Sequence, residues 1–220
     1  MRQQNGKAMP KRNYVSSARA SAAAETRERI IAAGARLLRK DASIASFSLD
    51  VVAKAAGITR LTVYNQFGSR RGLLEAVFDD IASRGGLFEL TEVMAMADPR
   101  AALDRVVEIF CTFWGHDAAV GGLNQAIATD PEFGEALLER NERRRELLAA
   151  LLSRIVGKHA AKRAAQDAVD LIFVLTSYPT FAALSRQRST AEVCRLLQTA
   201  CHAAVDALTP DQRGSAERKK

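Results

Sequence analysis

Hydrogen-bonding side chains are concentrated between residues 59 and 66 of this sequence. They are Thr59, Arg60, Thr62, Tyr64, Asn65 and Gln66, together with the apolar Leu61. Arginine, asparagine and glutamine can bond to base edges, while hydroxyl groups suit phosphate oxygens. Val63 and Phe67 are four residues apart and can hold the opposite side of a short helix inward. The segment therefore predicts a helix that packs on one side and presents base- and phosphate-binding groups on the other.

Two short helices joined by a glycine turn are predicted to position these side chains. Ser48 can cap the first helix, whose apolar positions are Val51, Val52 and Ala55. Gly57 can adopt the positive φ that ends this helix, and Thr59 can cap the second. Such a helix-turn-helix unit places its second helix in the major groove of DNA. A helical hairpin without that role is the alternative.

The residues of this unit resemble the TetR family of bacterial transcriptional regulators. The family pattern AAG-x-S/T-x-x-T-x-Y-x-x-F-x-S-K is found here at Ala55, Ala56, Gly57, Thr59, Thr62, Tyr64, Phe67, Ser69 and Arg70. Arg70 stands in the lysine position, so the positive charge is kept. The resemblance covers residues 26 to 82, including a helix expected from Thr26 to Ala42. Beyond that stretch only the general architecture and residues 175–184 are similar.

The resemblance implies roles for individual residues on double-stranded DNA with a roughly palindromic operator. It implies that phosphates are held and the register is set by Ser48, Thr62, Tyr64 and Arg70. We expect Arg60 to read a guanine and Leu61 to contact a thymine methyl group. The complete predicted DNA-binding set is Ser48, Thr59, Arg60, Leu61, Thr62, Tyr64, Asn65, Gln66 and Arg70.

The positive charge of the chain is unevenly distributed. The net charge is +7, yet residues 1–84 carry 15 Lys and Arg against 7 Asp and Glu, and the remainder carries 17 against 18. This asymmetry is expected if the part holding the helix-turn-helix unit meets a polyanion and the rest does not. A basic surface kept for solubility is the alternative, but it does not account for the asymmetry.

Composition and periodicity predict an all-α protein. Hydrophobic residues make up 48% of the 220 residues, and long stretches rich in alanine, leucine, arginine and glutamate lack period-two alternation. We expect a disordered basic arm at residues 1–22, an N-terminal three-helix helix-turn-helix domain at 23–84, a C-terminal helical effector-binding and dimerisation domain at 85–208, and a polar tail at 209–220. The first helix is expected to begin between Ser21 and Thr26. The arm either is an inert tail or reaches a neighbouring minor groove.

No arrangement of residues indicates catalysis, a cofactor or a metal site. The three histidines have no carboxylate or cysteine at metal-ligand spacing. The sequence also lacks a glycine-rich phosphate loop, a GxSxG elbow and a paired-carboxylate motif. We therefore expect no enzyme activity, no cofactor and no metal.

Cysteine usage and hydropathy predict a cytoplasmic protein. Cys111, Cys194 and Cys201 are odd in number and have no CxxC spacing, so no disulfide framework is indicated. Cys194 and Cys201 share a helix face, which leaves a redox sensor as the alternative to small buried hydrophobes. The N-terminal residues lack the apolar core of a signal peptide, and the longest apolar run, residues 171–184, is too short to span a bilayer.

The second half of the chain contains aromatic residues that the family resemblance places around a small-molecule cavity. The predicted effector-binding residues are Phe110, Trp114, His116, Asn141, Phe173 and Tyr178. Tyr178 and His116 would orient the ligand in an otherwise apolar pocket; an ordinary helical core is the alternative for the aromatic residues. Residues 139–146, ERNERRRE, are expected to be mostly solvated, with Asn141 or Arg144 facing a cavity as the alternative.

Two helices near the C-terminus are predicted to form a homodimer interface. Residues 168–175 are apolar almost all round, which predicts burial on every side and therefore a second partner. A capping box from Ser189 to Glu192 opens the last helix. The predicted interface residues are Leu171, Leu175, Val193, Leu196, Leu197, Ala200 and Ala204. The family resemblance implies the same four-helix arrangement between two copies.

These observations predict a dimeric DNA-binding transcriptional regulator, a repressor that a small-molecule effector releases from its operator. The helix expected from Ser69 to Ala82 begins beside the DNA surface and ends in the second half of the chain, so we expect an effector to move it. The alternative is an intracellular helical binding protein or enzyme that uses the basic unit only as a scaffold. Such a protein would show no salt-dependent DNA binding.

Overall fold

The computed structural model describes residues 12–40, 47–157 and 162–207, and its regular elements are helices. No strand occurs within these ranges, so the predicted all-α class is confirmed. Residues 1–11 of the predicted arm and the predicted tail at 209–220 lie outside the described residues.

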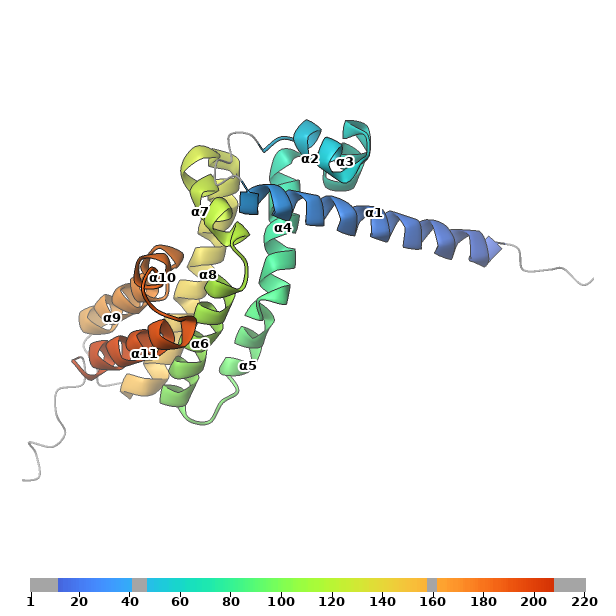
Figure 1. Ribbon diagram of the computed structural model, residues 1–220. Coiled ribbons are helices and arrows are strands. Elements are labelled where there is room, and N and C mark those ends of the chain that lie inside the picture. The colour runs from blue at the N-terminus through green and yellow to red at the C-terminus, as the bar shows by residue number, and fades with distance from the viewer. Residues whose placement is uncertain (1–11, 41–46, 158–161, 208–220) are drawn as a thin grey trace, which may run out of the picture.

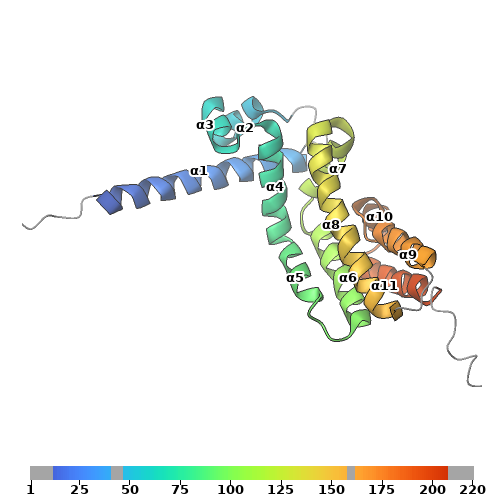
Figure 2. The ribbon, with the colours of Figure 1, turned by 180° about the vertical axis from the view of Figure 1, so that it is seen from behind.

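The helices follow one another with short connections. In chain order they are α1 (Arg12–Lys40), α2 (Leu49–Ala56), α3 (Arg60–Phe67), α4 (Arg70–Arg84), the 3-10 helix η2 (Leu87–Glu89), α5 (Leu90–Val93), α6 (Pro99–His116), α7 (Ala119–Thr129), α8 (Pro131–Val156), α9 (Lys162–Leu175), α10 (Tyr178–Leu184) and α11 (Thr190–Asp206). In Figure 1, α2 and α3 lie beside the start of α4 at one end of the molecule. From there α4 runs alongside α6 and α8, and α9, α10 and α11 cover the side away from α4, as the reverse view in Figure 2 confirms.

The first helix is longer than the sequence pattern predicts. It begins at Arg12, so the expected start between Ser21 and Thr26 and the expected disorder up to residue 22 are wrong. No glycine or proline interrupts the chain between Pro10 and Gly34, and residues 18–24 are rich in alanine, the strongest helix former. The helical pattern therefore continues toward the N-terminus, and this half of α1 extends away from the other helices (Figure 1).

The helix-turn-helix unit forms as predicted but with a shifted inner face on α2. Ser48 caps α2 by accepting a hydrogen bond from Val51 N, and Gly57 ends it with φ +67°. The residues of α2 that are buried are Leu49, Val52, Ala53 and Ala56. Val51 and Ala55, two of the three apolar positions named from the sequence, are exposed. The buried residues are spaced i, i+3, i+4 and i+7 from Leu49, the first residue of the helix, so the buried stripe begins at Leu49.

A bidentate ion pair joins the end of α1 to the start of α7. Arg39 Nε and Nη2 donate to the carboxylate oxygens of Asp117 at 2.7 and 2.5 Å, and Ala119 N donates to the same carboxylate at 2.9 Å. Burial raises the pKa of Asp117, but the hydrogen bonds from Arg39 and Ala119 and the charge of Arg39 outweigh it, so the net pKa is lowered. The charged carboxylate is therefore the form that stabilises this junction.

The last helix packs an apolar stripe into the core of its own subunit. Val193 and Leu197 are fully buried, and α11 packs against α6. Their predicted role in a dimer interface is therefore wrong, because the i, i+4 row that contains them faces inward. Leu171 and Leu196 are 49% and 42% exposed. The remaining predicted interface residues, Leu175, Ala200 and Ala204, are half-buried.

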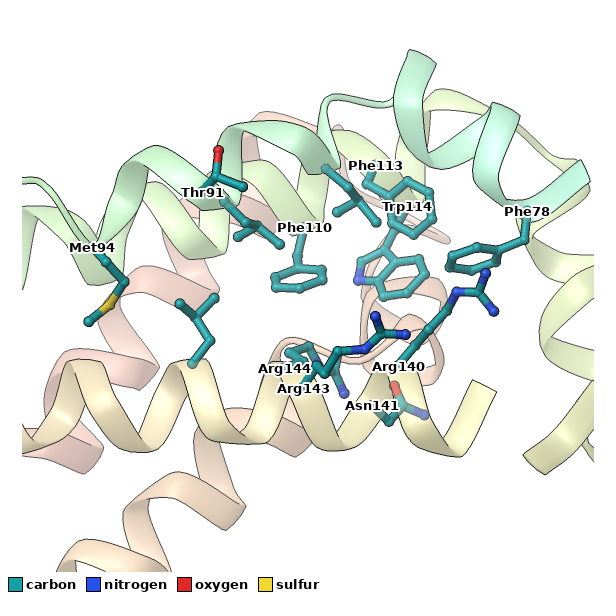
Figure 3. Close-up of a pocket in the computed structure, with 13 residues that line it drawn as sticks. Phe78, Thr91, Met94, Phe110, Phe113, Trp114, Arg140, Asn141, Arg143 and Arg144 are labelled. Carbon is teal, nitrogen blue, oxygen red and sulfur yellow. The ribbon is translucent and has the colours of Figure 1, made fainter. Parts of the chain in front are cut away.

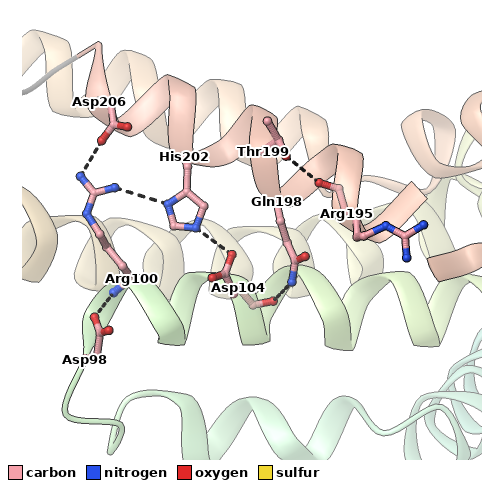
Figure 4. Close-up of polar contacts among 8 residues, drawn as sticks. All are labelled: Asp98, Arg100, Asp104, Arg195, Gln198, Thr199, His202 and Asp206. Carbon is pink, nitrogen blue, oxygen red and sulfur yellow. Dashed lines mark hydrogen bonds and ion pairs between the residues drawn. The ribbon is translucent and has the colours of Figure 1, made fainter. Parts of the chain in front are cut away.

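Polar contacts fix the rotation of α11 on α6 (Figure 4). His202 Nε2 lies 2.7 Å from Asp104 Oδ1, and Gln198 Nε2 donates to Asp104 O at 3.2 Å. Nearer the end of α11, Arg100 Nη2 donates to Asp206 at 2.6 Å. These contacts hold the side of α11 that carries His202 on α6 and leave Leu196 turned outward.

The chain bends sharply between α9 and α10. Pro179 lies in the first turn of α10 and has no N–H for a continuing helix, and the two helix axes differ by 55°. Among the described residues no single helix is long and apolar enough to cross a bilayer, and α9 and α10 meet the length and composition criteria only as this bent pair.

Candidate nucleic-acid interface and ligand cavity

The third helix presents its predicted DNA-facing side chains to solvent. Leu61 and Tyr64 are 66% and 54% exposed, and Arg60 and Asn65 are exposed as well. Behind them Val63 is fully buried, so α3 is supported by the core while its outer side is open. Arg60 Nε lies 3.3 Å from Asp50 Oδ2, but both side chains are exposed, so this pair contributes little and does not lock the arginine.

Some residues of the predicted DNA-binding set are used in the local structure of the unit. Thr59 caps α3 by accepting from Thr62 N at 3.2 Å, and the two hydroxyl oxygens are 2.9 Å apart. Ser48 similarly caps α2. Thr62, Gln66 and Ser48 are half-buried. The hydroxyl groups of Ser48, Thr59 and Thr62 therefore take part in the caps that hold α2 and α3.

Sequence reasoning missed Arg27, which supports α3 from α1. Arg27 Nη1 donates to Gln66 O at 3.2 Å, and its guanidinium lies 4.5 Å from the centre of the Phe67 ring. This contact joins residues 39 positions apart in the sequence. No local pattern marks it, because capping and periodicity report only near neighbours.

Arg70, for which the resemblance implies a phosphate contact, is bonded to other residues of the protein. Its Nη1 pairs with Asp130 Oδ2, and its Nε donates to Phe47 O at 2.7 Å. Burial lowers the pKa of Arg70. Asp130 also caps α8 by accepting from Phe133 N at 3.0 Å. Arg70 thus joins the helix-turn-helix end of the molecule to the start of α8.

The helices of the second part surround two adjoining cavities. The larger has a volume of about 570 Å³, within the range of small-molecule sites. Its lining, shown in Figure 3, is Phe78, Leu87, Leu90, Thr91, Met94, Phe110, Phe113, Trp114, Arg140, Asn141, Arg143, Arg144 and Leu147. The smaller, of about 230 Å³, shares Phe78, Trp114, Arg140, Asn141 and Arg144 and adds residues of α7 and of the α9–α10 bend.

Most of the predicted effector-binding residues line these cavities. Phe110, Trp114 and Asn141 line the larger cavity, and Phe173 and Tyr178 line the smaller. His116 is exposed and lines neither of them, so its predicted position is wrong. Two residues along a helix turn the side chain by about 200°, so His116 points away when Trp114 faces inward.

Arg144 lines both cavities, as the alternative for the 139–146 segment predicts, and is not solvated as the first expectation had it. It is 8% exposed; Nη1 donates to Thr176 O at 3.0 Å and Nη2 to Phe173 O at 3.4 Å. Its guanidinium also lies 4.0 Å from the centre of the Phe173 ring and 5.2 Å from that of Phe110. Burial, and secondarily the charge of Arg145, lower the pKa of Arg144 to about 10, so it remains charged at neutral pH.

The fourth helix connects the helix-turn-helix end of the molecule to the cavities. Near its start, a Cβ at Gly72 would overlap the Phe67 carbonyl oxygen, so only glycine allows α4 to approach the end of α3 this closely. Further along, Phe78 lines both cavities and packs edge-on against Phe113 at 6.0 Å. The guanidinium of Arg140 lies over the Phe78 ring, 4.8 Å from the ring centre.

The cysteines have the surroundings of buried structural thiols. Burial raises the pKa of Cys111 and of Cys201 to about 12, and the pKa of Cys194 is also raised by burial. The thiolate, which is the reactive form, is therefore disfavoured at all three. Among the described residues no group of three or more His, Cys, Asp or Glu could hold a metal ion.

The chain is similar in sequence to known regulators. Residues 30–77 match the model of the bacterial regulatory proteins of the tetR family. The HTH-type transcriptional regulator EthR of Mycolicibacterium smegmatis is 36% identical over 114 residues, which cover 50% of this chain and 52% of that protein. The chain thus spans about half the length of this relative. EthR of Mycobacterium tuberculosis is 25% identical over 198 residues, 86% of this chain and 90% of that protein.

Solved structures have the same fold. A protein described as a TetR-family transcriptional regulator from Rhodococcus has a TM-score of 0.64 at 18% identity, over 84% of this chain and 100% of that one. A transcriptional regulator from Pseudomonas aeruginosa has a TM-score of 0.67 at 16% identity, over 88% and 93%. These matches show that residues 30–77 carry the sequence pattern of the tetR-family regulatory proteins and that the chain has the fold of TetR-family regulators, with an exposed α3 that the core supports.

Proposed function

We propose that the protein is a homodimeric repressor that a small molecule releases from a roughly palindromic operator. Each subunit inserts α3 into a major groove, with Arg60 and Leu61 reading bases and Tyr64 contacting a phosphate. The effector occupies the cavities between α4, α6 and α8. DNA binding explains why the outer side of α3 is polar and exposed. A binding protein or enzyme that used this unit only as a scaffold would not need such a surface.

The observation that carries the proposal is the path of α4. One end of this helix packs on α3 through Gly72, and Phe78 lines both cavities. A ligand that displaces Phe78 therefore acts on the element that holds α3 in place. Release requires the ligand to bind one spacing of the two α3 helices better than the other, because equal affinity for both would shift nothing.

The dimer is proposed to form through the outer faces of α9 and α11. Leu171, Val174 and Leu196 are 49%, 57% and 42% exposed, whereas Ala168, Val169 and Ile172 of the same segment are buried. Helix α9 is thus apolar on its inner and its outer face, but a single subunit buries only the inner face. A second copy related by a two-fold axis would cover the other with the same residues.

The proposal is tested by selecting duplexes from random DNA with the purified full chain and measuring their affinity over a salt series. We expect a palindromic consensus and an affinity that falls steeply with salt. Operator-bound and effector-bound crystal structures should differ in the separation of the two α3 helices. Two structures that superpose throughout, or selected DNA without two related half-sites, would contradict the proposal.

A further inference from the structure

Arg144 is a buried cation that has no carboxylate partner among the described residues. The neighbouring arginines differ: Arg140 pairs with Asp79 at 2.7 Å, and Arg145 pairs with Asp170. Within the described part of the chain, the hydrogen bonds of Arg144 go to the carbonyl oxygens of Phe173 and Thr176, and its guanidinium lies near two aromatic rings. Burying a charge without a counter-charge is costly, so this arrangement leaves an interaction to be completed.

One hydrogen-bonding group of the guanidinium is unused. Its Nε is buried and has no hydrogen-bond partner among the described residues, whereas both terminal nitrogens donate to carbonyls. The rings of Phe110 and Phe173 lie near the guanidinium carbon, which favours an approach in the plane of the group. An in-plane approach to Nε is the geometry in which arginine binds a carboxylate.

The residues around Arg144 reinforce this preference. Among the residues whose side chains are described, the charged ones that line the cavities are Arg140, Arg143 and Arg144, and no aspartate or glutamate is found in either lining. Asn141 precedes Arg144 by one helical turn, lines both cavities and makes no hydrogen bond to a described residue. In Figure 3 these side chains of α8 face Phe110 and Trp114 of α6 across the cavity. The site therefore combines a cationic, hydrogen-bonding floor with an aromatic wall.

We propose that the effector is a small organic acid with an apolar body, whose carboxylate binds Arg144 and Asn141 while its body packs on Phe110, Trp114 and Phe78. This inference rests on the proposed function for the claim that the cavity is the effector site. It adds the chemical class of the ligand.

A structural role for Arg144 is the competing explanation. The bend at Pro179 leaves carbonyls near the end of α9 unpaired within the helix, and a cation there interacts favourably with the helix dipole. Trp114 Nε1 and Arg144 Nη1 both donate to Thr176 O at 3.0 Å. Capping accounts for the terminal nitrogens of Arg144 but not for Nε, so ligand binding distinguishes the two explanations.

Trp114 provides a direct measurement, because it is the only tryptophan in the chain and lines both cavities. The full-length protein is titrated with a panel of aryl- and alkylcarboxylates, such as phenylbutanoate and decanoate, and with their primary amides, which match in shape but carry no charge. Fluorescence and melting temperature report binding. We expect the acids that bind to do so about tenfold or more tighter than their amides, as hydrogen bonds to charged groups allow.

Variants separate binding from capping. Arg144→Met should abolish the preference for acids, with little change in amide affinity. Arg163→Met removes one charge from a side chain that is 93% exposed and should leave both affinities unchanged. If Arg144→Met does not fold, the comparison of acids with amides on the wild type still decides. Amides that bind as tightly as acids, no binding by any acid of the panel, or an unchanged preference in folded Arg144→Met would overturn the inference.

Operator affinity measured in the same samples keeps this inference separate from the proposed function. Acid binding that depends on Arg144 but leaves the DNA complex intact would support the ligand class and contradict release by the effector. Release by a neutral ligand, equal in wild type and Arg144→Met, would support the proposed function and overturn the ligand class.

Discussion

Replacing Arg70 by alanine is expected to weaken the junction between the helix-turn-helix unit and the rest of the subunit. The substitution removes the cation that pairs with Asp130 and the donor to Phe47 O. Asp130 is buried at the N-terminus of α8, so its carboxylate would remain there without this partner. Destabilisation, and not a uniform loss of DNA affinity, should be the main effect.

The magnitude follows from the burial of the two side chains. Removing one partner of a fully buried ion pair costs about 3 to 5 kcal/mol, whereas exposed pairs contribute about 0 to 1 kcal/mol. The side chains of Arg70 and Asp130 are 33% and 9% exposed, which places this pair between the two limits. We expect a loss of about 2 kcal/mol in the free energy of unfolding, or a fall in Tm of about 4 to 8 °C for a chain of this size.

The neighbouring residue provides a matched control. Arg71 lies on the same helical turn and forms an i, i+4 pair with Glu75 at 2.8 Å, with both side chains partly exposed. Arg71→Ala removes the same charge but should cost much less, because an i, i+4 pair at the surface contributes little to stability. Urea unfolding of Arg70→Ala, Asp130→Asn and the double variant gives the coupling energy, since asparagine can still cap α8.

Two outcomes would refute the reasoning. If Arg70→Ala is as stable as Arg71→Ala, the ion pair with Asp130 does not stabilise the junction. If Arg70→Ala alone reduces the slope of operator affinity against salt by about one, Arg70 contacts a phosphate, as the resemblance implies.

Three further substitutions test other parts of the molecule. Arg60→Ala should relax base preference at one operator position, at a cost of about 1 to 3 kcal/mol; an unchanged consensus among selected duplexes would argue against base reading. Leu196→Glu should yield folded monomers in sedimentation equilibrium, because this side chain is 42% exposed, and a persistent dimer would place the interface elsewhere. Asp117→Asn should destabilise the protein at neutral pH. The lowered pKa of Asp117 means that its contribution is present above the ordinary carboxyl pKa and lost as pH falls through the lowered value. The two proteins should therefore become equally stable in acid, and a stability difference that is constant with pH would exclude this linkage.

The elements that short-range patterns encode could be predicted closely. The caps Ser48 and Thr59 and the left-handed Gly57 lie within a few residues of the groups they satisfy, so the helix-turn-helix unit follows from local geometry. The exposure of Leu61 and Tyr64 follows from the inward position of Val63 on the same helix. In contrast, the start of α1 was placed about ten residues too late, because alanine-rich sequence without a stop signal does not mark a boundary.

Local patterns were enough to predict the all-helical class, helix α3 with its exposed side, and most of the aromatic residues around the cavities. The burial of Arg144, the pair between Arg70 and Asp130, and the inward Leu197 and outward Leu196 of α11 became visible only once the helices were packed. These contacts join residues far apart in the chain: Arg144 meets Thr176 across 32 positions and Arg70 meets Asp130 across 60. The polar pattern of residues 139–146 predicts a solvent-exposed helix surface. Whether one of these side chains is buried depends on which helix packs against it, here the end of α9.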